Sequence, residues 1–118
     1  MKKLILLPIL LLSFVIISFT PQQLLKTKVT IDVINKLGKH IEGAEVTLYK
    51  TIDDFNNNKN QVQLTKKTNK KGIVKFTKLD AISYYIQVEK GDLSNMFTAE
   101  KTKALVSKKA NKFIIIIE

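Results

Sequence analysis

From residue 26 onward, apolar and polar residues alternate with a period of two, and this pattern constrains the fold more than any other feature of the sequence. The clearest run is VTIDV, residues 29–33. Successive side chains of a strand point to opposite faces, so such a run is typical of a strand with one buried face. About seven short runs, separated by turn signals roughly every ten residues, predict an all-β, antiparallel β-sandwich.

The phase of the alternation predicts which residues form the core. These are Val29, Ile31, Val33, Ile41, Ala44, Val46, Leu48, Val74, Phe76, Leu79, Tyr84, Ile86, Val88 and residues within 113–117. Gly38 and Gly72 each end a polar cluster before a strand, so we expect tight turns with positive φ there.

Three segments do not follow the simple alternation. Residues 51–60, rich in Asp and Asn, predict a long polar loop. Val62 and Leu64 predict a short edge strand. The run 113–117 is apolar throughout, so we expect it to be buried on both faces or paired centrally.

The N-terminal segment has the features of an export signal. Lys2 and Lys3 precede an apolar run over residues 4–19, which is short for a membrane span and is interrupted by Pro8. We expect residues 1–20 to be a signal peptide or an uncleaved N-terminal anchor, and residues 26–118 to form the domain. The domain would then be periplasmic or extracellular, with membrane contact only through residues 4–19 if the signal is uncleaved.

The sequence carries a formal net charge of +10, and all 20 of its basic residues are lysines. Arginine is the residue suited to bidentate recognition of phosphate and guanine, so we expect a solvated lysine coat and no nucleic-acid partner. Six of these residues form what we call the lysine edge: Lys66, Lys67, Lys70, Lys71, Lys75 and Lys78.

The residue types needed for metal or nucleophilic chemistry are scarce. The chain has no cysteine and one histidine, His40, which we expect to be exposed in a hairpin turn. Asp54, Asn56 and Asn58 have the spacing of calcium ligands, but the required glycine and the bidentate glutamate are missing. We therefore expect no catalytic residue, no metal site and no cofactor.

Three blocks of sequence resemble a known family. They are VINKLGKHIEGAEVTLYK from residue 33, TNKKGIVKFTKL from residue 68 and YYIQVEKGD from residue 84. Together they resemble the carboxypeptidase regulatory-like (transthyretin-like, prealbumin-type) β-sandwich family, in particular small exported proteins of the Bacteroidota type. Asn35 and Asn69 replace the usual aspartates, and His40 replaces the usual proline; asparagine keeps the acceptor that closes an Asx turn. The resemblance implies an Ig-like or prealbumin-like sandwich and no assigned chemistry.

Related Cna-B-like sandwiches sometimes carry a Lys–Asn isopeptide bond, for which Lys28 and Asn111 are the only candidate pair. Neither residue interrupts an apolar alternation as a buried partner would, so we expect no such bond.

Two functions remain open at this point. The first is a non-enzymatic, exported module of the cell envelope that is structural or binds an envelope protein or glycan. Its binding surface would comprise the out-facing or loop aromatic residues Tyr49, Phe55, Tyr85 and Phe97. The alternative is a small-ligand carrier or enzyme with a loop-end pocket formed by residues 51–60 and 91–103.

Overall fold

The computed structural model describes residues 26–96 and 98–118. The expected signal segment, residues 1–20, lies outside the described residues. Within the described part, no helix has the length and apolar character needed to cross a membrane.

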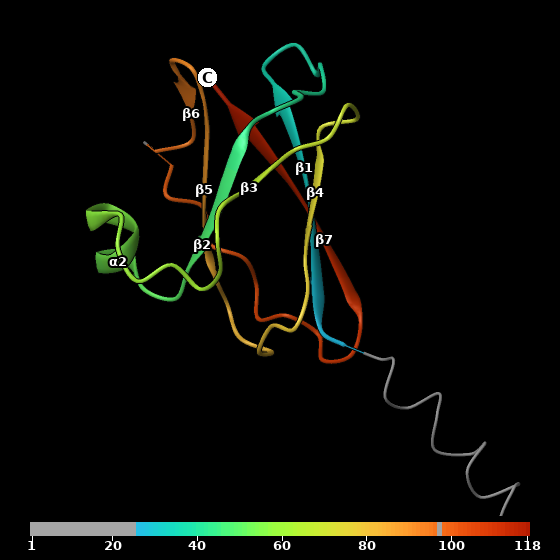
Figure 1. Cartoon of the computed structure of the whole chain (residues 1–118), viewed down its shortest axis with the longest axis vertical. Helices are drawn as coiled ribbons and strands as arrows, with labels where there is room; N and C mark the ends of the chain where they lie inside the picture. The colour runs from blue at the N-terminus through green and yellow to red at the C-terminus, as the bar shows by residue number, and fades with distance from the viewer. Residues whose placement is uncertain (1–25, 97) are drawn as a thin grey trace, which may run out of the picture.

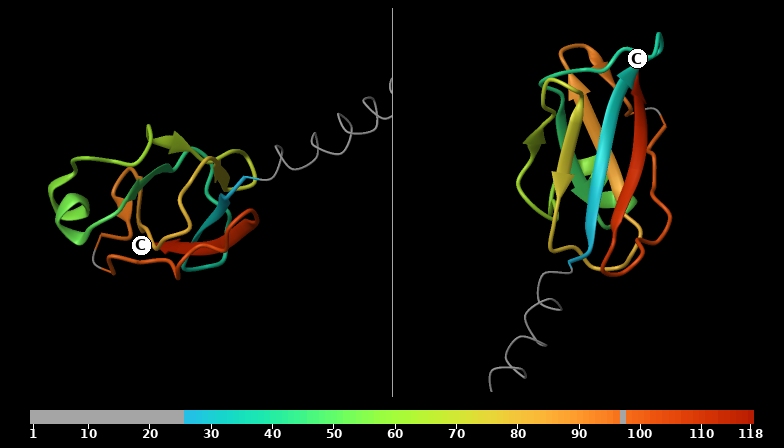
Figure 2. Two further views of the ribbon diagram at one scale, coloured as in Figure 1. Left: turned by 90° about the horizontal axis from the view of Figure 1, so that it is seen from below. Right: turned by 90° about the vertical axis from the view of Figure 1, so that its right-hand side faces the viewer.

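The described chain forms a two-layered β-sandwich (Figures 1 and 2). The first sheet has three strands in the order β4-β1-β7, and the second has four in the order β3-β2-β5-β6. Their bounds are β1 Lys28–Asn35, β2 Glu45–Tyr49, β3 Lys66–Lys67, β4 Ile73–Phe76, β5 Tyr85–Lys90, β6 Leu93–Ser94 and β7 Ala110–Ile117. The all-β sandwich expected from the alternation is therefore confirmed.

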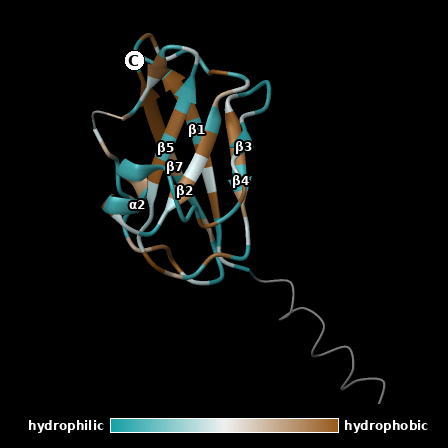
Figure 3. Cartoon of the chain, turned by 60° about the vertical axis from the view of Figure 1, so that its left-hand side comes forward, coloured by the Kyte–Doolittle hydropathy of each residue, from teal (hydrophilic) through white to brown (hydrophobic). Residues whose placement is uncertain are grey.

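The core lies between the two sheets, as the phase of the alternation predicts. Its buried cluster comprises Val29, Ile31, Val33, Ala44, Val46, Leu48, Val74, Phe76, Leu79, Tyr84, Ile86, Val88, Leu105, Ile115 and Ile117. Ile41, expected in this set, is only partly buried, and Leu105 was not anticipated. Figure 3 shows the resulting brown stretches along the strands and the hydrophilic colour of the short helix α2.

The last strand, β7, corrects two expectations. It pairs with β1 in parallel from Lys28↔Ala110 to Asn35↔Ile117, so the sandwich is not wholly antiparallel. It also lies at the edge of its sheet, with Ile114 66% and Ile116 48% exposed, while Ile115 and Ile117 are buried. An unbroken apolar run thus hides an ordinary in–out alternation, because both faces carry isoleucine.

The polar segment 51–60 is not only a loop, because it contains helix α2, Ile52–Asn57. The Thr51 hydroxyl caps its N-terminus by accepting from the Asp54 amide, and Asn58 ends it in the left-handed conformation at φ 52°. A threonine N-cap and an asparagine at the C-terminal end are favoured at such positions. Phe55 is the one buried residue of α2 and fixes the helix to the sheet.

The edge strand expected at Val62 and Leu64 is displaced along the chain to β3. Leu64 is 81% exposed, whereas Val62 packs partly against the core.

Both predicted glycine turns are confirmed, with φ of 82° at Gly38 and 77° at Gly72. Asn35 Oδ1 accepts from the amides of residues 37 and 39, and Asn69 Oδ1 accepts from those of residues 71 and 73. These asparagines close Asx turns as expected.

Candidate functional site

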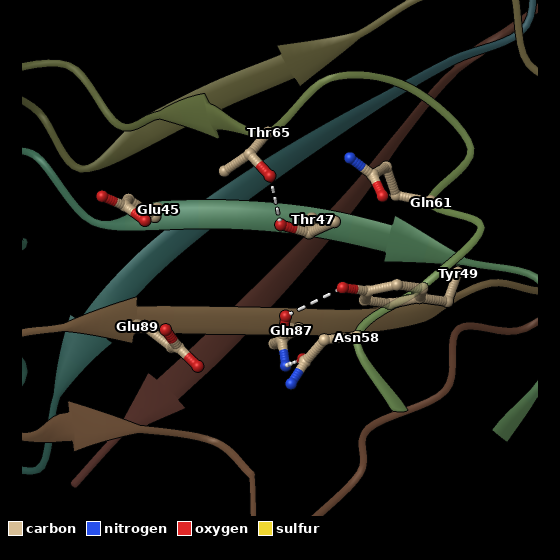
Figure 4. A pocket seen from close by; sticks show the side chains of 8 residues that line it. All are labelled: Glu45, Thr47, Tyr49, Asn58, Gln61, Thr65, Gln87 and Glu89. Atoms are coloured by element: carbon tan, nitrogen blue, oxygen red, sulfur yellow. Dashed lines mark hydrogen bonds between the residues drawn. The ribbon is translucent and has the colours of Figure 1, made fainter. Parts of the chain in front are cut away.

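A polar concavity lies on the outer face of the four-stranded sheet, beside α2. We call it the polar hollow; its volume is about 270 Å³, and it is lined by Glu45, Thr47, Tyr49, Asn58, Gln61, Thr65, Gln87 and Glu89 (Figure 4). Strand alternation explains its composition, because β2 and β5 send Val46, Leu48, Ile86 and Val88 into the core. The residues between them point outward, and the register sets Glu45 opposite Glu89 and Thr47 opposite Gln87.

Side-chain hydrogen bonds hold the floor of the polar hollow in place. The Tyr49 hydroxyl donates to Gln87 Oε1 at 3.1 Å, and Gln87 Nε2 donates to Asn58 Oδ1 at 2.7 Å (Figure 4). The hydroxyls of Thr47 and Thr65 lie 2.7 Å apart and form a second bond. Because Gln87 is buried and bonded at both ends of its amide, its side chain has a fixed orientation.

The Tyr49 hydroxyl stays a neutral donor. Burial, and secondarily the negative charge of Glu89, raises the pKa of Tyr49 above its ordinary value. The polar hollow therefore presents neutral amides and hydroxyls between two exposed carboxylates, Glu45 and Glu89. Such a lining can hydrogen-bond a hydroxylated or amide-containing ligand.

The structure brings three of the four predicted aromatic residues together, but not as an exposed surface. The rings of Tyr49 and Phe55 lie edge to face with centroids 6.0 Å apart, and those of Phe55 and Tyr85 are 6.2 Å apart. Phe55 is fully buried and Tyr49 is 3% exposed, so the expectation that these two face solvent is wrong. Because α2 lies over the outer face of the sheet, these residues form a satellite apolar cluster that anchors the helix. Phe97 lies outside the described residues, and the binding role of the set stays a prediction.

The two segments of the predicted loop-end pocket meet at Gln87. Its Nε2 donates to Asn58 Oδ1 from the first segment and lies 3.1 Å from Met96 Sδ of the second. The polar hollow, however, is lined by residues of β2 and β5 and by Asn58, Gln61 and Thr65, and not by the described residues of segment 91–103. Gln87 was not singled out from the sequence, since a lone glutamine in a strand gives no chemical signal.

Two further sequence candidates, His40 and Asp54, are not part of the lining of the polar hollow. His40 is exposed, and its Nδ1 lies 3.0 Å from Asp32 Oδ1 on the other sheet. Of the residues with calcium spacing, Asp54 is engaged within its own segment, where its Oδ1 accepts from Asn60 Nδ2 at 3.1 Å, whereas the Oδ1 of Asn58 accepts from Gln87 Nε2. Within residues 26–96 and 98–118, no group of three or more His, Cys, Asp or Glu residues could hold a metal ion.

Asn111 is engaged with the backbone, where it ties the end of the preceding turn to β1. Its Nδ2 donates to the carbonyl of Lys28 at 3.0 Å, and its Oδ1 accepts from the amide of Val106 at 2.8 Å. The Lys28 side chain is exposed.

All six residues of the lysine edge are exposed. Lys66 Nζ donates to the carbonyl of Lys75 at 3.0 Å and lies 5.2 Å from the ring centroid of Phe76. This lysine therefore reaches from β3 to β4, and its aliphatic stem shields core residues from water there.

Comparison with known proteins gives one family match and a set of distant structural neighbours. The sequence model of the DR_A0283-like, Ig-like domain family matches residues 23–112. No curated protein matches the sequence.

The neighbours among solved structures include pilus proteins. A streptococcal ancillary pilin aligns with a TM-score of 0.58 at 15% identity, over 80% of this chain and 32% of that one. The pilus 2b backbone protein of group B streptococcus aligns at 0.55 and 17% identity, over 77% and 40%. BcpA, the major pilin subunit of Bacillus cereus, aligns at 0.52 and 18% identity, over 78% and 29%. This chain spans less than half of each of these proteins, and at such low sequence identity the structural similarity shows a shared fold alone.

Proposed function

The chain belongs to the DR_A0283-like family of Ig-like domains, and we propose that it serves outside the cytoplasm as a non-enzymatic, structural module of the cell envelope. Export is supported by the lysines and the apolar run of the first twenty residues. The similarity in fold to pilins and a pilus backbone protein supports the same compartment. We also propose that, within the Ig-like sandwiches, the chain is related to the carboxypeptidase regulatory-like family that its sequence motifs resemble.

The observation that carries the structural role is the parallel pairing of the first and last strands. β1 and β7 stay in register over eight residue pairs, from Lys28↔Ala110 to Asn35↔Ile117. Because the two strands are parallel, the start of β1 and the C-terminus lie at opposite ends of the sandwich (Figure 1). A force that pulls these two ends apart would therefore slide β1 past β7 along their common axis.

This geometry resists force because the load is shared. The hydrogen bonds of a parallel ladder are evenly spaced along the strands. Sliding the two strands past each other must break these bonds together, whereas peeling two strands apart breaks them one after another. A domain loaded through β1 and β7 is thus suited to transmit tension or to act as a spacer.

Single-molecule pulling tests this proposal with two attachment geometries. The chain has no cysteine, so pairs of introduced cysteines give unique handles. Handles at residues 26 and 118 load β1 and β7 in shear. Handles at residues 26 and 78 peel β1 from β4, because these strands are antiparallel and Leu79 bonds back to Thr27 at the same end.

We expect a higher unfolding force for the 26–118 pair than for the 26–78 pair. Equal forces would contradict a load-bearing role. Export is tested separately with alkaline phosphatase fused after residue 118, since this reporter needs the disulfides that form outside the cytoplasm. We expect activity that depends on residues 2–19, and an inactive fusion of the full chain would contradict export.

A second candidate function rests on the polar hollow, which would bind a neutral polar ligand such as an envelope glycan. Its support is the fixed Gln87 amide between Tyr49 and Asn58. Binding to a glycan array that is lost in Gln87→Ala, while the exposed Asn56→Ala variant still binds, would favour this alternative over a purely structural role.

A further inference from the structure

The outer edge of β7 carries backbone groups that its own sheet does not use. The amide of Lys28 donates to the carbonyl of Lys109. In a parallel pair with this register, the backbone N–H and C=O groups of the odd-numbered residues of β7 point toward β1. Glu118 exchanges two backbone bonds with Ser94, at 3.1 and 3.2 Å, on the opposite side. Since successive residues alternate in direction, the N–H and C=O groups of Lys112, Ile114 and Ile116 point away from β1.

The chain that faces this edge is bonded elsewhere. The amide of Ile86 donates to the carbonyl of Glu100 at 3.0 Å, and the amide of Thr102 donates to the carbonyl of Tyr84 at 2.8 Å. Segment 98–102 therefore extends the edge of β5 and does not pair with β7. We call the gap between this segment and β7 the seam. Among the described residues, no backbone hydrogen bond crosses the seam, and just beyond the end of β7 Glu118 bonds to Ser94 of β6.

The seam is hollow along its length. One hollow of about 250 Å³ is lined by Glu100, Lys101, Thr102 and by Ile86 and residues 113–115. A second, of about 200 Å³, continues past Glu100 toward Ile116 and Glu118. The first hollow reaches the core side chains Ile86 and Ile115. Ile114 and Ile116 remain exposed on the outer rim of the seam. An open edge of this length and composition is a template for strand addition.

The seam also contains a carboxylate with no cation beside it in the described structure. Glu100 lines both hollows and accepts only a long bond, 3.4 Å, from the Thr98 hydroxyl. Burial raises its pKa above the ordinary value, although the Thr98 hydrogen bond opposes this. The neighbouring Lys101 is directed to the Tyr85 ring, with Nζ 5.4 Å from the centroid. Glu118, at the closed end, is paired with Lys36 at 2.7 Å.

We propose that the seam binds an extended peptide segment of a partner protein as an added strand, and that this segment carries a lysine or arginine between apolar residues. Backbone bonds to Lys112, Ile114 and Ile116 supply the strand pairing. Alternate apolar side chains cover the floor at Ile86 and Phe113, and the cationic side chain compensates Glu100. This inference goes beyond the structural role and does not depend on it.

Synthetic heptapeptides of known sequence test the proposal by fluorescence anisotropy with the domain of residues 22–118 and with the full chain. The probe alternates valine and lysine, and the matched control alternates valine and glutamate. The domain is itself basic, so non-specific attraction favours the glutamate peptide. We expect the lysine peptide to bind at least about tenfold more tightly, because only its side chains can form a charge-assisted hydrogen bond with Glu100.

Two protein variants locate the binding to the seam. Ile114→Pro removes an N–H that points away from β1, so the sheet keeps its ladder, and Ile114→Val is the control that keeps this N–H. We expect Ile114→Pro to lose the lysine peptide and Ile114→Val to retain it. Glu100→Gln should remove the preference for the lysine peptide, while its circular dichroism stays that of the folded parent.

Several results would overturn the proposal. One is tighter binding of the glutamate peptide, and another is equal binding to parent and Ile114→Pro. A lysine peptide whose backbone amides are N-methylated cannot pair as a strand, so its binding as tightly as the unmodified peptide would exclude strand addition. Concentration-dependent dimerisation that Ile114→Pro abolishes, without peptide binding, would assign the edge to a second copy of this chain instead.

Discussion

Asn95 offers the sharpest test of how this small sandwich is held together. Its side chain takes the place of a neighbouring strand along the edge of β5: Oδ1 accepts from the amide of Val88 at 2.8 Å, and Nδ2 donates to the carbonyl of Ile86 at 2.7 Å. The residue is 2% exposed, so water cannot replace these bonds. Asn95→Ala would leave one buried donor and one buried acceptor without partners.

The expected cost follows from those two groups. Each unsatisfied buried group costs about 1–3 kcal/mol, so Asn95→Ala should lower the free energy of unfolding by about 2–6 kcal/mol. Urea unfolding measures this change, and hydrogen exchange at the Val88 amide reports the lost bond directly. The matched control is Asn56→Ala, an exposed asparagine of α2, whose effect should stay within about 0.5 kcal/mol. Asn95→Ala and Asn56→Ala that unfold at the same urea concentration would refute the reasoning.

Four further outcomes are expected. Phe76→Ala should cost about 3–5 kcal/mol in urea unfolding because the ring is fully buried, whereas exposed Thr77→Ala should cost little; equal effects would mean the strand phase is wrong. Gly72→Ala should destabilise by about 1–3 kcal/mol more than Gly38→Ala, because a Cβ there would lie 2.8 Å from the Val33 carbonyl oxygen whereas Gly38 has open space; equal melting temperatures would argue against this crowding. The raised pKa of Glu100 means that its ionisation costs stability as pH rises, so Glu100→Gln should melt higher than the parent at pH 7 and equally below about pH 4, and a pH-independent difference would contradict this. The lysine edge should not retain the domain on DNA or anionic vesicles at about 0.3 M salt, and retention lost on changing its six lysines to glutamine would make it a binding face.

Alternation was a sufficient guide for four strands with a polar outer face, but it failed at Val62 and Leu64, where no strand forms. In β1, β2, β4 and β5 it predicts both the strand and its buried face, because a shift by one residue would expose the whole apolar set. It could not predict which residues of β7 are buried, because the run of isoleucines has no polar residues to mark one face. The exposed Ile114 and Ile116 are chemically the same as their buried neighbours.

The helix α2 and the polar hollow could not be predicted from the sequence for a different reason. α2 has six residues, fewer than two helical turns, so its signal lies in the Thr51 cap and in burial of Phe55 by tertiary contact. The polar hollow depends on which out-facing residues of β2 and β5 stand side by side. Register and a returning loop decide this, and neither Gln87 nor Asn95 carries a local pattern.

The unfolding force of two proline variants of β7 tests the load-bearing account most directly. By the same alternation, the amide of Ile115 points to β1 and that of Ile114 points away, so only Ile115→Pro removes a bond of the parallel ladder. Both variants are pulled by handles at residues 26 and 118, under conditions where circular dichroism shows them folded. The account predicts a clearly lower unfolding force for Ile115→Pro and the parental force for Ile114→Pro. The same force for both variants would contradict it.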